Sequence, residues 1–141
     1  MKIELSIQPS EEELKAISDG ISAFNAQYLP EDGEFDSGFR FVITARNESG
    51  EFIGGIQASV VWSYCVLELL WLSEESRGKG LGSKLIKQLV EFATEKGLSQ
   101  IRTETLDFQA KPFYEKQGFR VYGELEDTPK GHKTYFLVKA L

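Results

Sequence analysis

Hydrophobic and polar positions alternate in two different periods over the first 25 residues. Residues near 2–8 alternate with a period of two, which predicts a strand. Ser10 followed by Glu13 is a capping box, which predicts that a helix starts there. Apolar residues then recur at helical spacing at Leu14, Ile17, Ile21 and Phe24. Gly20 interrupts this pattern, so one broken helix and two short helices are both compatible with it.

The next segment reads as a loop followed by three strands. Residues 29–38 are rich in turn-forming and acidic residues. Residues 39–46 and 52–62 are predicted to pair as a hairpin through a turn at 47–50. Gly54 and Gly55 inside the second strand indicate a bulge or a sharp bend. The near-continuous apolar run at 66–72 predicts a third strand that is buried on both faces.

From residue 82 onward, helices and strands alternate. A helix is predicted over 82–96, ended by Gly97, and a strand over 100–106. A short helix is predicted over 110–117, ended by Gly118, and two strands over 119–125 and 133–138. Antiparallel strands followed by strand–helix–strand units define an α/β sandwich with a mixed sheet and a right-handed crossover through 82–96. At 141 residues, we expect a single domain over residues 1–141.

Composition and charge narrow the classes of function. The chain is 41% hydrophobic and 27% charged, without an apolar run long enough for a membrane helix. Its net charge of −6 argues against general nucleic-acid binding. Cys65 is the only cysteine, so no intrachain disulfide can form. The first residues lack the apolar block of a signal peptide, and we therefore expect a cytoplasmic setting.

A glycine-rich turn between the strand at 66–72 and the following helix is the strongest functional signal. Backbone N–H groups and the helix N-terminus converge in such a turn and favour phosphate. Gly78, Gly80 and Gly82 alternate, which matches neither the nucleotide P-loop nor the dinucleotide fingerprint. Arg77 and Lys79 add positive charge in an acidic chain. The alternative is a flexible surface turn without a ligand.

Two motifs together resemble the GNAT N-acetyltransferase superfamily. The spacing Arg77-x-x-Gly80-x-Gly82 is similar to the family's acyl-CoA pyrophosphate loop. The segment 110–119, Ala-x-x-Phe-Tyr-x-x-x-Gly-Phe, is similar to its second signature. The resemblance covers most of the chain and is strongest over 67–119. It implies a GNAT-like sandwich with about six to seven strands, about four helices and splayed central strands.

The resemblance also implies acetyl-CoA as co-substrate and residues that hold it. The pantetheine arm would lie along the backbone of Leu70, Trp71 and Leu72 in the manner of an added strand. The pyrophosphate would lie on backbone N–H groups of Arg77, Gly78, Lys79, Gly80, Leu81, Gly82 and Ser83. Ala110 and Phe113 would lie against the pantetheine and Lys116 near the adenosine phosphate. Asp107 stands where the family commonly has an Asn that hydrogen-bonds the coenzyme, so the resemblance implies a cofactor-binding position here, although an anion is a poorer neighbour for a phosphate-bearing cofactor.

Acetyl transfer to an amine needs a proton acceptor for the amine and a proton donor for the departing thiolate. The resemblance places Tyr114 beside the thioester sulfur as the acid, with a core tyrosine as the alternative. Glu68 is a lone carboxylate in an apolar strand, on the same face as Leu70 and Leu72, so burial is expected to raise its pKa and suit it as the base. Glu104 on the neighbouring strand competes for this role. The alternatives for Glu68 are a position at the wet end of the strand or a structural pair with an arginine such as Arg102.

The acceptor side is less defined by the sequence. His132 lies in a Pro-Gly loop near the last strands, where family members contact acceptors, and an exposed turn histidine is the alternative. Trp62, Tyr28, Phe24 and Phe35 are aromatic candidates for an acceptor pocket, with core packing as the alternative. The acidic loop at 31–36 could attract a cation or be merely solvated. His132 and Cys65 are too few for a zinc site, and no metal is expected.

Together these residues predict an acetyl-CoA-dependent N-acetyltransferase. The expected acceptor is a small primary amine, attacking directly in a ternary complex without a covalent enzyme intermediate. A peptide or protein amine is the second choice of acceptor. A non-catalytic acyl-CoA-binding domain and a ligand-free interaction module are the alternatives from other classes. Either a monomer or a homodimer is compatible with the chain.

Overall fold

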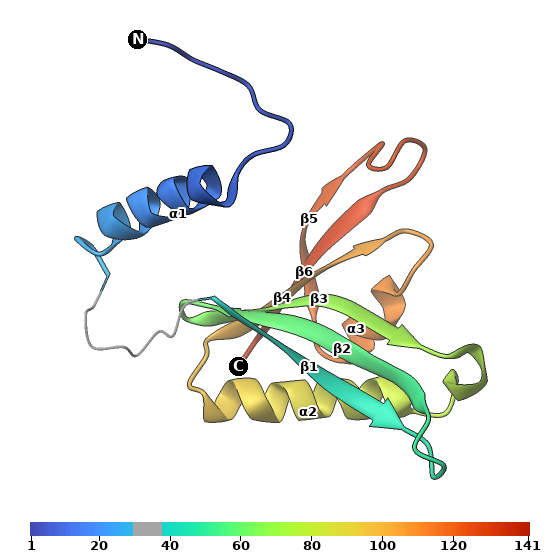
Figure 1. Cartoon of the computed structure of the whole chain (residues 1–141). Coiled ribbons are helices and arrows are strands. Elements are labelled where there is room, and N and C mark those ends of the chain that lie inside the picture. The colour runs from blue at the N-terminus through green and yellow to red at the C-terminus, as the bar shows by residue number, and fades with distance from the viewer. Residues whose placement is uncertain (30–37) are drawn as a thin grey trace. The chain divides into compact units, whose positions relative to one another are not determined.

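The computed structural model describes residues 1–29 and 38–141, which belong to two compact units, Met1–Glu34 and Phe35–Leu141 (Figure 1). The first unit contains one helix, α1 (Glu11–Asn25). Ser10 and Glu13 form the predicted capping box, with the backbone N–H of each donating to the side chain of the other at 2.8 and 3.1 Å. The helix runs through Gly20 without a break.

The strand predicted near residues 2–8 is wrong, because residues 1–10 form no strand. Alternation fixes which side chains share a face, but a strand also needs a neighbour to satisfy its backbone groups. The described part of the first unit offers none.

The second unit is built on a six-stranded mixed sheet, as the resemblance implied. The strands lie in the order β1-β2-β3-β4-β6-β5, and only β3 and β4 are parallel. Their bounds are β1 (Phe39–Arg46), β2 (Phe52–Val61), β3 (Tyr64–Leu72), β4 (Gln100–Leu106), β5 (Arg120–Leu125) and β6 (Thr134–Ala140). All six strands predicted after residue 38 agree with these bounds to within two residues at each end.

Helix α2 (Leu81–Glu95) connects the two parallel strands and buries one face against the sheet. Its apolar stripe, Leu85, Ile86, Leu89 and Ala93, belongs to the core. Gly97, at φ 73°, ends the helix in a Schellman motif, in which the N–H of Leu98 donates to the carbonyl of Ala93 at 3.0 Å. With α3 (Lys111–Lys116), the described residues contain three α-helices and a short 3₁₀ turn, η1 (Glu74–Ser76), rather than the four expected helices.

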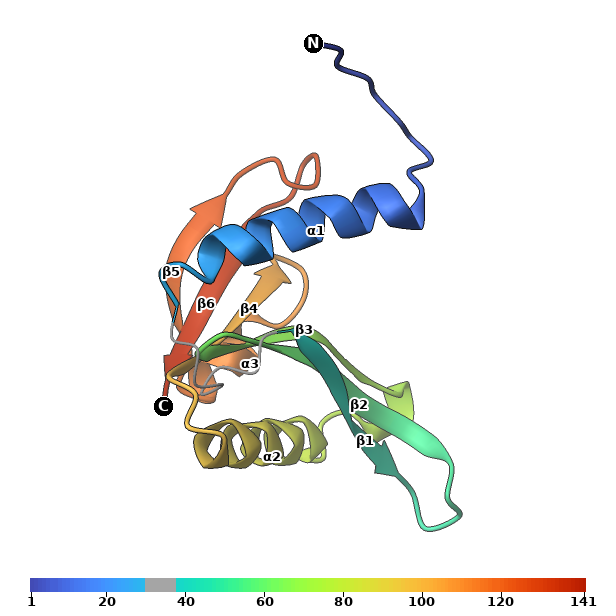
Figure 2. The ribbon, with the colours of Figure 1, turned by 60° about the vertical axis from the view of Figure 1, so that its left-hand side comes forward.

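Strands β3 and β4 pair only at one end. Their parallel register runs from Tyr64 opposite Gln100 to Leu67 opposite Thr103, and stops there although both strands continue. Figure 2 shows the two halves of the sheet, β1–β3 and β4–β6, diverging from the paired ends. This divergence confirms the splayed central strands implied by the resemblance.

A β-bulge in β3 lies at the point of divergence. Gln57 of β2 pairs with Leu69 and the next residue, Ala58, pairs with Leu67, so Glu68 is the extra residue. Beyond the bulge, the side chains that continue the alternation from Leu67 lie on the opposite face of the sheet. Leu67 is buried, whereas Leu69 is 62% exposed and Trp71 is 52% exposed. The expected burial of 66–72 on both faces is therefore wrong for the second half of the strand.

Candidate active site

A cavity of about 570 Å³ fills the space where β3 and β4 diverge. It is bounded by the second half of β3, by the end of β4, and by the first turns of α2 and α3. Its lining contains ten of the residues singled out by the sequence: Glu68, Leu70, Trp71, Leu72, Arg77, Gly82, Glu104, Ala110, Phe113 and Tyr114. Leu69, Thr103, Thr105 and Gln109 complete the lining.

One wall of this cavity is an open strand edge. Strand β3 pairs with β2 up to Leu72, but its pairing with β4 ends at Leu67. The backbone from Glu68 to Leu72 therefore has no strand partner on its β4 side. An edge of this kind suits an extended, amide-containing ligand such as a pantetheine arm.

The turn between β3 and α2 has the geometry of an anion site. The first helical hydrogen bond of α2 joins the N–H of Lys84 to the carbonyl of Gly80 at 3.2 Å, so the three N–H groups of residues 81–83 have no acceptor within the helix. Gly78 and Gly80 have φ of 72° and 81°, a region that residues with a side chain rarely adopt. Arg77 donates from Nε to the Leu72 carbonyl at 3.2 Å, which ties the turn to the open strand.

Gly82 has a different role from the other two glycines. A Cβ at this position would lie 3.1 Å from the Phe113 ring, so its absence lets α2 pack closely against α3. Phe113 is half-buried and lines the cavity. The two signature motifs of the sequence thus meet through this contact and through a hydrogen bond of 2.8 Å from Gln117 Nε2 to Ser83 Oγ.

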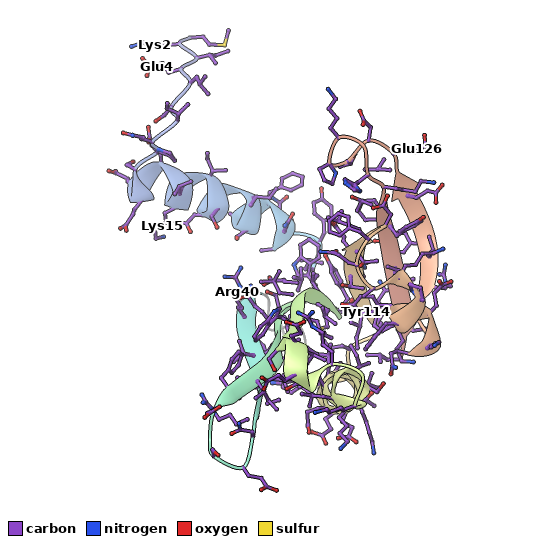
Figure 3. The ribbon with its side chains drawn as sticks, turned by 90° about the vertical axis from the view of Figure 1, so that its right-hand side faces the viewer. Lys2, Glu4, Lys15, Arg40, Tyr114 and Glu126 are labelled. Carbon is purple, nitrogen blue, oxygen red and sulfur yellow. The ribbon has the colours of Figure 1, made fainter. Side chains whose placement is uncertain are left out.

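Tyr114 of α3, which is labelled in Figure 3, lines the cavity and is only 5% exposed. Its ring packs edge-on against Phe113 and Phe119, with centroid distances of 5.3 and 5.4 Å. Burial raises the pKa of Tyr114, and a hydrogen bond with Thr103 partly opposes this rise. The phenol therefore remains protonated at neutral pH and can donate a proton or a hydrogen bond.

Glu68 is the extra residue of the bulge, directly after the last residue of β3 that pairs with β4, and its side chain belongs to a polar network. Its carboxylate accepts hydrogen bonds from Ser59 Oγ and from Gln57 Nε2, the latter at 2.6 Å, and forms an ion pair with Arg40 Nε at 3.1 Å. Hydrogen bonds from Ser59 and Gln57 lower the pKa of Glu68; its partial burial opposes this shift, and Arg40 adds to it. The expected rise of this pKa is therefore wrong, since the carboxylate is well supplied with donors.

The bulge also corrects the face on which Glu68 was placed. Leu70 and Leu72 pack against the core, whereas the partners of Glu68 on β2 alternate with the buried residues Ile56 and Ala58. Glu68 thus points to the opposite face from Leu70 and Leu72. Its arginine partner is Arg40, while Arg102 stacks on Tyr64.

Asp107 and His132 are brought together, but outside the lining of the cavity. Asp107 Oδ1 lies 3.0 Å from His132 Nδ1, and Asp107 Oδ2 accepts a hydrogen bond of 3.0 Å from the N–H of Lys133. Burial tends to raise the pKa of Asp107, but the bonds from His132 and Lys133 outweigh it and lower the pKa. This pair joins the loop after β4 to the loop before β6.

The remaining candidates lie apart from the cavity or in the other unit. Trp62 is in the β2–β3 turn, at the end of β3 away from the divergence, and has a φ of 47°. Tyr28 follows α1 and contacts Phe24, with ring centroids 5.6 Å apart. Lys116 is exposed in the last turn of α3. Phe35 and the acidic loop at 31–36 lie outside the described residues.

Six polar residues of the site were missed by sequence reasoning: Arg40, Gln57, Ser59, Thr103, Thr105 and Gln109. Gln57 and Ser59 alternate with Ile56, Ala58 and Val60, and this period of two was a usable signal for a polar face. Thr103 donates from Oγ1 to the Leu67 carbonyl at 3.0 Å, at the last paired position of β3 and β4. Nothing in the sequence singled out that position.

Comparison with known proteins agrees with this geometry. The family model for the acetyltransferase (GNAT) family matches residues 8–119. A blasticidin-S acetyltransferase of Streptomyces morookaense is 40% identical over 98 residues, which cover 69% of this chain and 72% of the relative. An acetyltransferase of Agrobacterium fabrum is 29% identical over 99% of this chain and 98% of its own. The crystal structure of an acetyltransferase from Bacillus cereus superposes with a TM-score of 0.86 at 30% identity and covers 98% of both chains.

The chain belongs to the GNAT acetyltransferase family. It is an acetyl-CoA-dependent N-acetyltransferase, as the two motifs implied. None of the helices in the described ranges is both long and apolar enough to cross a membrane.

Proposed function

We propose that this enzyme acetylates a small primary amine by direct attack on acetyl-CoA in a ternary complex. The observation that carries the proposal is that one cavity is lined by a buried, protonated phenol, Tyr114, and by a carboxylate held ionised, Glu68. An alkylamine is mostly protonated at neutral pH, so an anionic site favours its capture. The related enzyme from Streptomyces morookaense is named for the acceptor blasticidin S, and the homologues act on small-molecule amines, which supports the choice of a small amine.

Acetyl-CoA supplies a thioester whose carbonyl carbon the amine attacks. The open edge of β3 binds and orients the pantetheine arm, and the N–H groups of residues 81–83 bind the pyrophosphate together with Arg77. Phe113 packs on the pantetheine. The fit rests on an unpaired strand edge that leads to an uncapped helix N-terminus, with Arg77 joining the two.

Glu68 takes the proton that the amine nitrogen must lose, either directly or through water. Its low pKa makes it a weak base, so its first contribution is to bind the ammonium ion and its second is to accept the proton as the N–C bond forms. As the C–S bond breaks, Tyr114 donates a hydrogen bond or a proton to the sulfur. The low exposure of Tyr114 keeps water from competing with this contact.

A covalent cysteine intermediate is not part of the proposal. Burial and the neighbouring Glu68 charge raise the pKa of Cys65 to about 12, so its thiolate is scarce at neutral pH. Cys65 is buried and is not among the residues that line the cavity.

The test combines initial-rate kinetics by thiol release with a panel of primary alkylamines and an unrelated peptide bearing a free N-terminus. Direct attack predicts intersecting double-reciprocal lines and turnover of the small amines. We expect Glu68→Gln to lose about 10²-fold or more in kcat/KM while acetyl-CoA still raises Tm. Parallel lines, or turnover of the peptide alone, would contradict the proposal.

A further inference from the structure

A second cavity of about 400 Å³ opens beside the first and shares Glu68, Thr103 and Glu104 with it. It extends from the divergence back along the paired ends of β3 and β4. Tyr64, Val66, Leu67, Arg102 and Tyr122 line the part that the first cavity does not reach. On β4, Arg102 and Glu104 alternate with buried residues, so both project from the face opposite the core.

The charges in this second cavity are separated along its length. Glu68 and Glu104 lie at the end shared with the first cavity, next to the expected position of the thioester. Arg102 lies at the other end, because it pairs in register with Val66, two residues before Glu68. A spacing of two strand residues is about 7 Å. A ligand that spans the cavity therefore meets the carboxylates of Glu68 and Glu104 near the reacting atoms. It meets the guanidinium of Arg102 at a distance that a short alkyl chain bridges.

Arg102 is held in place without a counter-ion. Its guanidinium carbon lies 3.7 Å from the centroid of the Tyr64 ring. The side-chain oxygen of Gln100, with the amide turned to accept, lies 2.8 and 3.0 Å from Nη2 and Nε of Arg102. In residues 1–29 and 38–141, no carboxylate forms an ion pair with Arg102. A half-buried, stacked guanidinium with free donors is preorganised for a planar anion.

Resting on the proposed function, we propose that the acceptor is an amino-carboxylic acid, whose carboxylate binds Arg102 while its amine lies at Glu68 and Glu104. A simple alkylamine would leave Arg102 unpaired in the cavity, and a diamine would place a second cation beside it. Both lose the charge-assisted hydrogen bonds that a carboxylate makes with the guanidinium fork.

The kinetic test compares acceptors of equal length that share a primary amine and differ only in the group at the opposite end of the chain. β-Alanine, γ-aminobutyrate, δ-aminovalerate and ε-aminocaproate are measured beside alkylamines and diamines of equal length by thiol release. We expect one chain length of the amino acid to exceed its alkylamine in kcat/KM by about 10- to 100-fold. Arg102→Met should remove this difference, Arg102→Lys should remove part of it, and Arg46→Met, on β1, should leave it unchanged. The two Arg102 variants should lower kcat/KM for the amino acid and leave the alkylamine unaffected.

A binding measurement separates this proposal from the proposed function. Calorimetry follows the best amino acid titrated into protein saturated with CoA, for wild type and for Arg102→Met with its Tm checked. Binding that needs Arg102, without thiol release from any amine, would support the carboxylate site and contradict the proposed reaction. Equal turnover of amino acids and alkylamines that Arg102→Met does not change would overturn the carboxylate site and leave the reaction standing. Stronger acceptance of the aminoalkylphosphonate of equal length would also overturn the assignment to a carboxylate.

Discussion

Arg40 on β1 forms an ion pair with Glu68 on β3 by reaching over β2, with 3.1 Å between Nε and Oε2. The strand position of Arg40 lies opposite Ser59, which also donates to Glu68. Figure 3 labels Arg40 at the start of β1 and Tyr114 on α3. The carboxylate of Glu68, at the point of divergence, is therefore fixed by residues from two other strands, β1 and β2.

Replacing Arg40 should change the pH dependence of the reaction. Arg40 helps to lower the pKa of Glu68, so Arg40→Met should raise that pKa and move the acidic limb of the kcat/KM profile to higher pH. The matched control is Arg46→Met on the same strand, whose guanidinium bonds to the Gly50 carbonyl instead. An acidic limb that stays in place in Arg40→Met would show that Glu68 does not set it.

The same network should contribute to stability in a defined range of pH. The pKa of Glu68 is lower in the folded protein than its usual 4.5, so the network stabilises the fold above about pH 4.5, and this contribution is lost as pH falls through the folded-state value. Thermal melts of wild type and Glu68→Gln should therefore differ more at pH 7 than at pH 3. A difference that grows on acidification would have the wrong sign.

The substitution Gly82→Ala should be tolerated only if the side chain of Phe113 is replaced by a smaller one. A Cβ at Gly82 would lie 3.1 Å from the Phe113 ring, and overpacking of this kind costs about 1–3 kcal/mol. We expect Gly82→Ala to lower the free energy of unfolding and raise the KM for acetyl-CoA, and Gly82→Ala/Phe113→Leu to recover stability. Denaturant titration measures the first effect. If the double variant is the less stable of the two, the contact is not the cause.

Cys65 should be inert in the folded enzyme. Burial and Glu68 raise the pKa of its thiol to about 12, which leaves little thiolate at pH 8. We expect slow alkylation by iodoacetamide at pH 8 and fast alkylation in denaturant, with Cys65→Ala retaining acetyl transfer. Loss of turnover in a folded Cys65→Ala variant would point to a covalent intermediate.

Asp107 should contribute to the stability of the two loops that it joins. Both of its oxygens bond to residues 132 and 133, so Asp107→Asn should lower Tm while the Kd for acetyl-CoA changes little. His132→Ala is the matched variant and should lower Tm in the same direction. A weakened Kd in Asp107→Asn alone would show that Asp107 contacts the coenzyme, as its position in the family motif implied.

The sequence predicted most of the sheet because each strand after residue 38 has its own signal of alternation or of turn residues. Its two motifs also located Arg77, Phe113 and Tyr114, which line one cavity. These predictions depend on local pattern and on order along the chain, both of which a single sequence records.

The errors come from interactions between strands. The bulge at Glu68 depends on the register of β2 against β3. The face of the sheet on which Glu68, Leu69 and Trp71 lie could therefore not be predicted from the residues of β3 alone. The pKa of Glu68 depends on Ser59 and Gln57 of β2 and, to a smaller extent, on Arg40 of β1, none of which lies in the same strand as Glu68. Residues 2–8 alternate like a strand, but the described part of their unit contains no strand to pair with them.

The most direct test of the account is the kcat of Tyr114→Phe, measured by thiol release together with the Kd for acetyl-CoA. Phe preserves the edge-on packing against Phe113 and Phe119 and removes only the hydroxyl. If Tyr114 protonates or hydrogen-bonds the departing sulfur, kcat falls by about 10²-fold or more while Kd and Tm stay close to those of wild type. A kcat equal to that of wild type would contradict the assignment of Tyr114 as the acid.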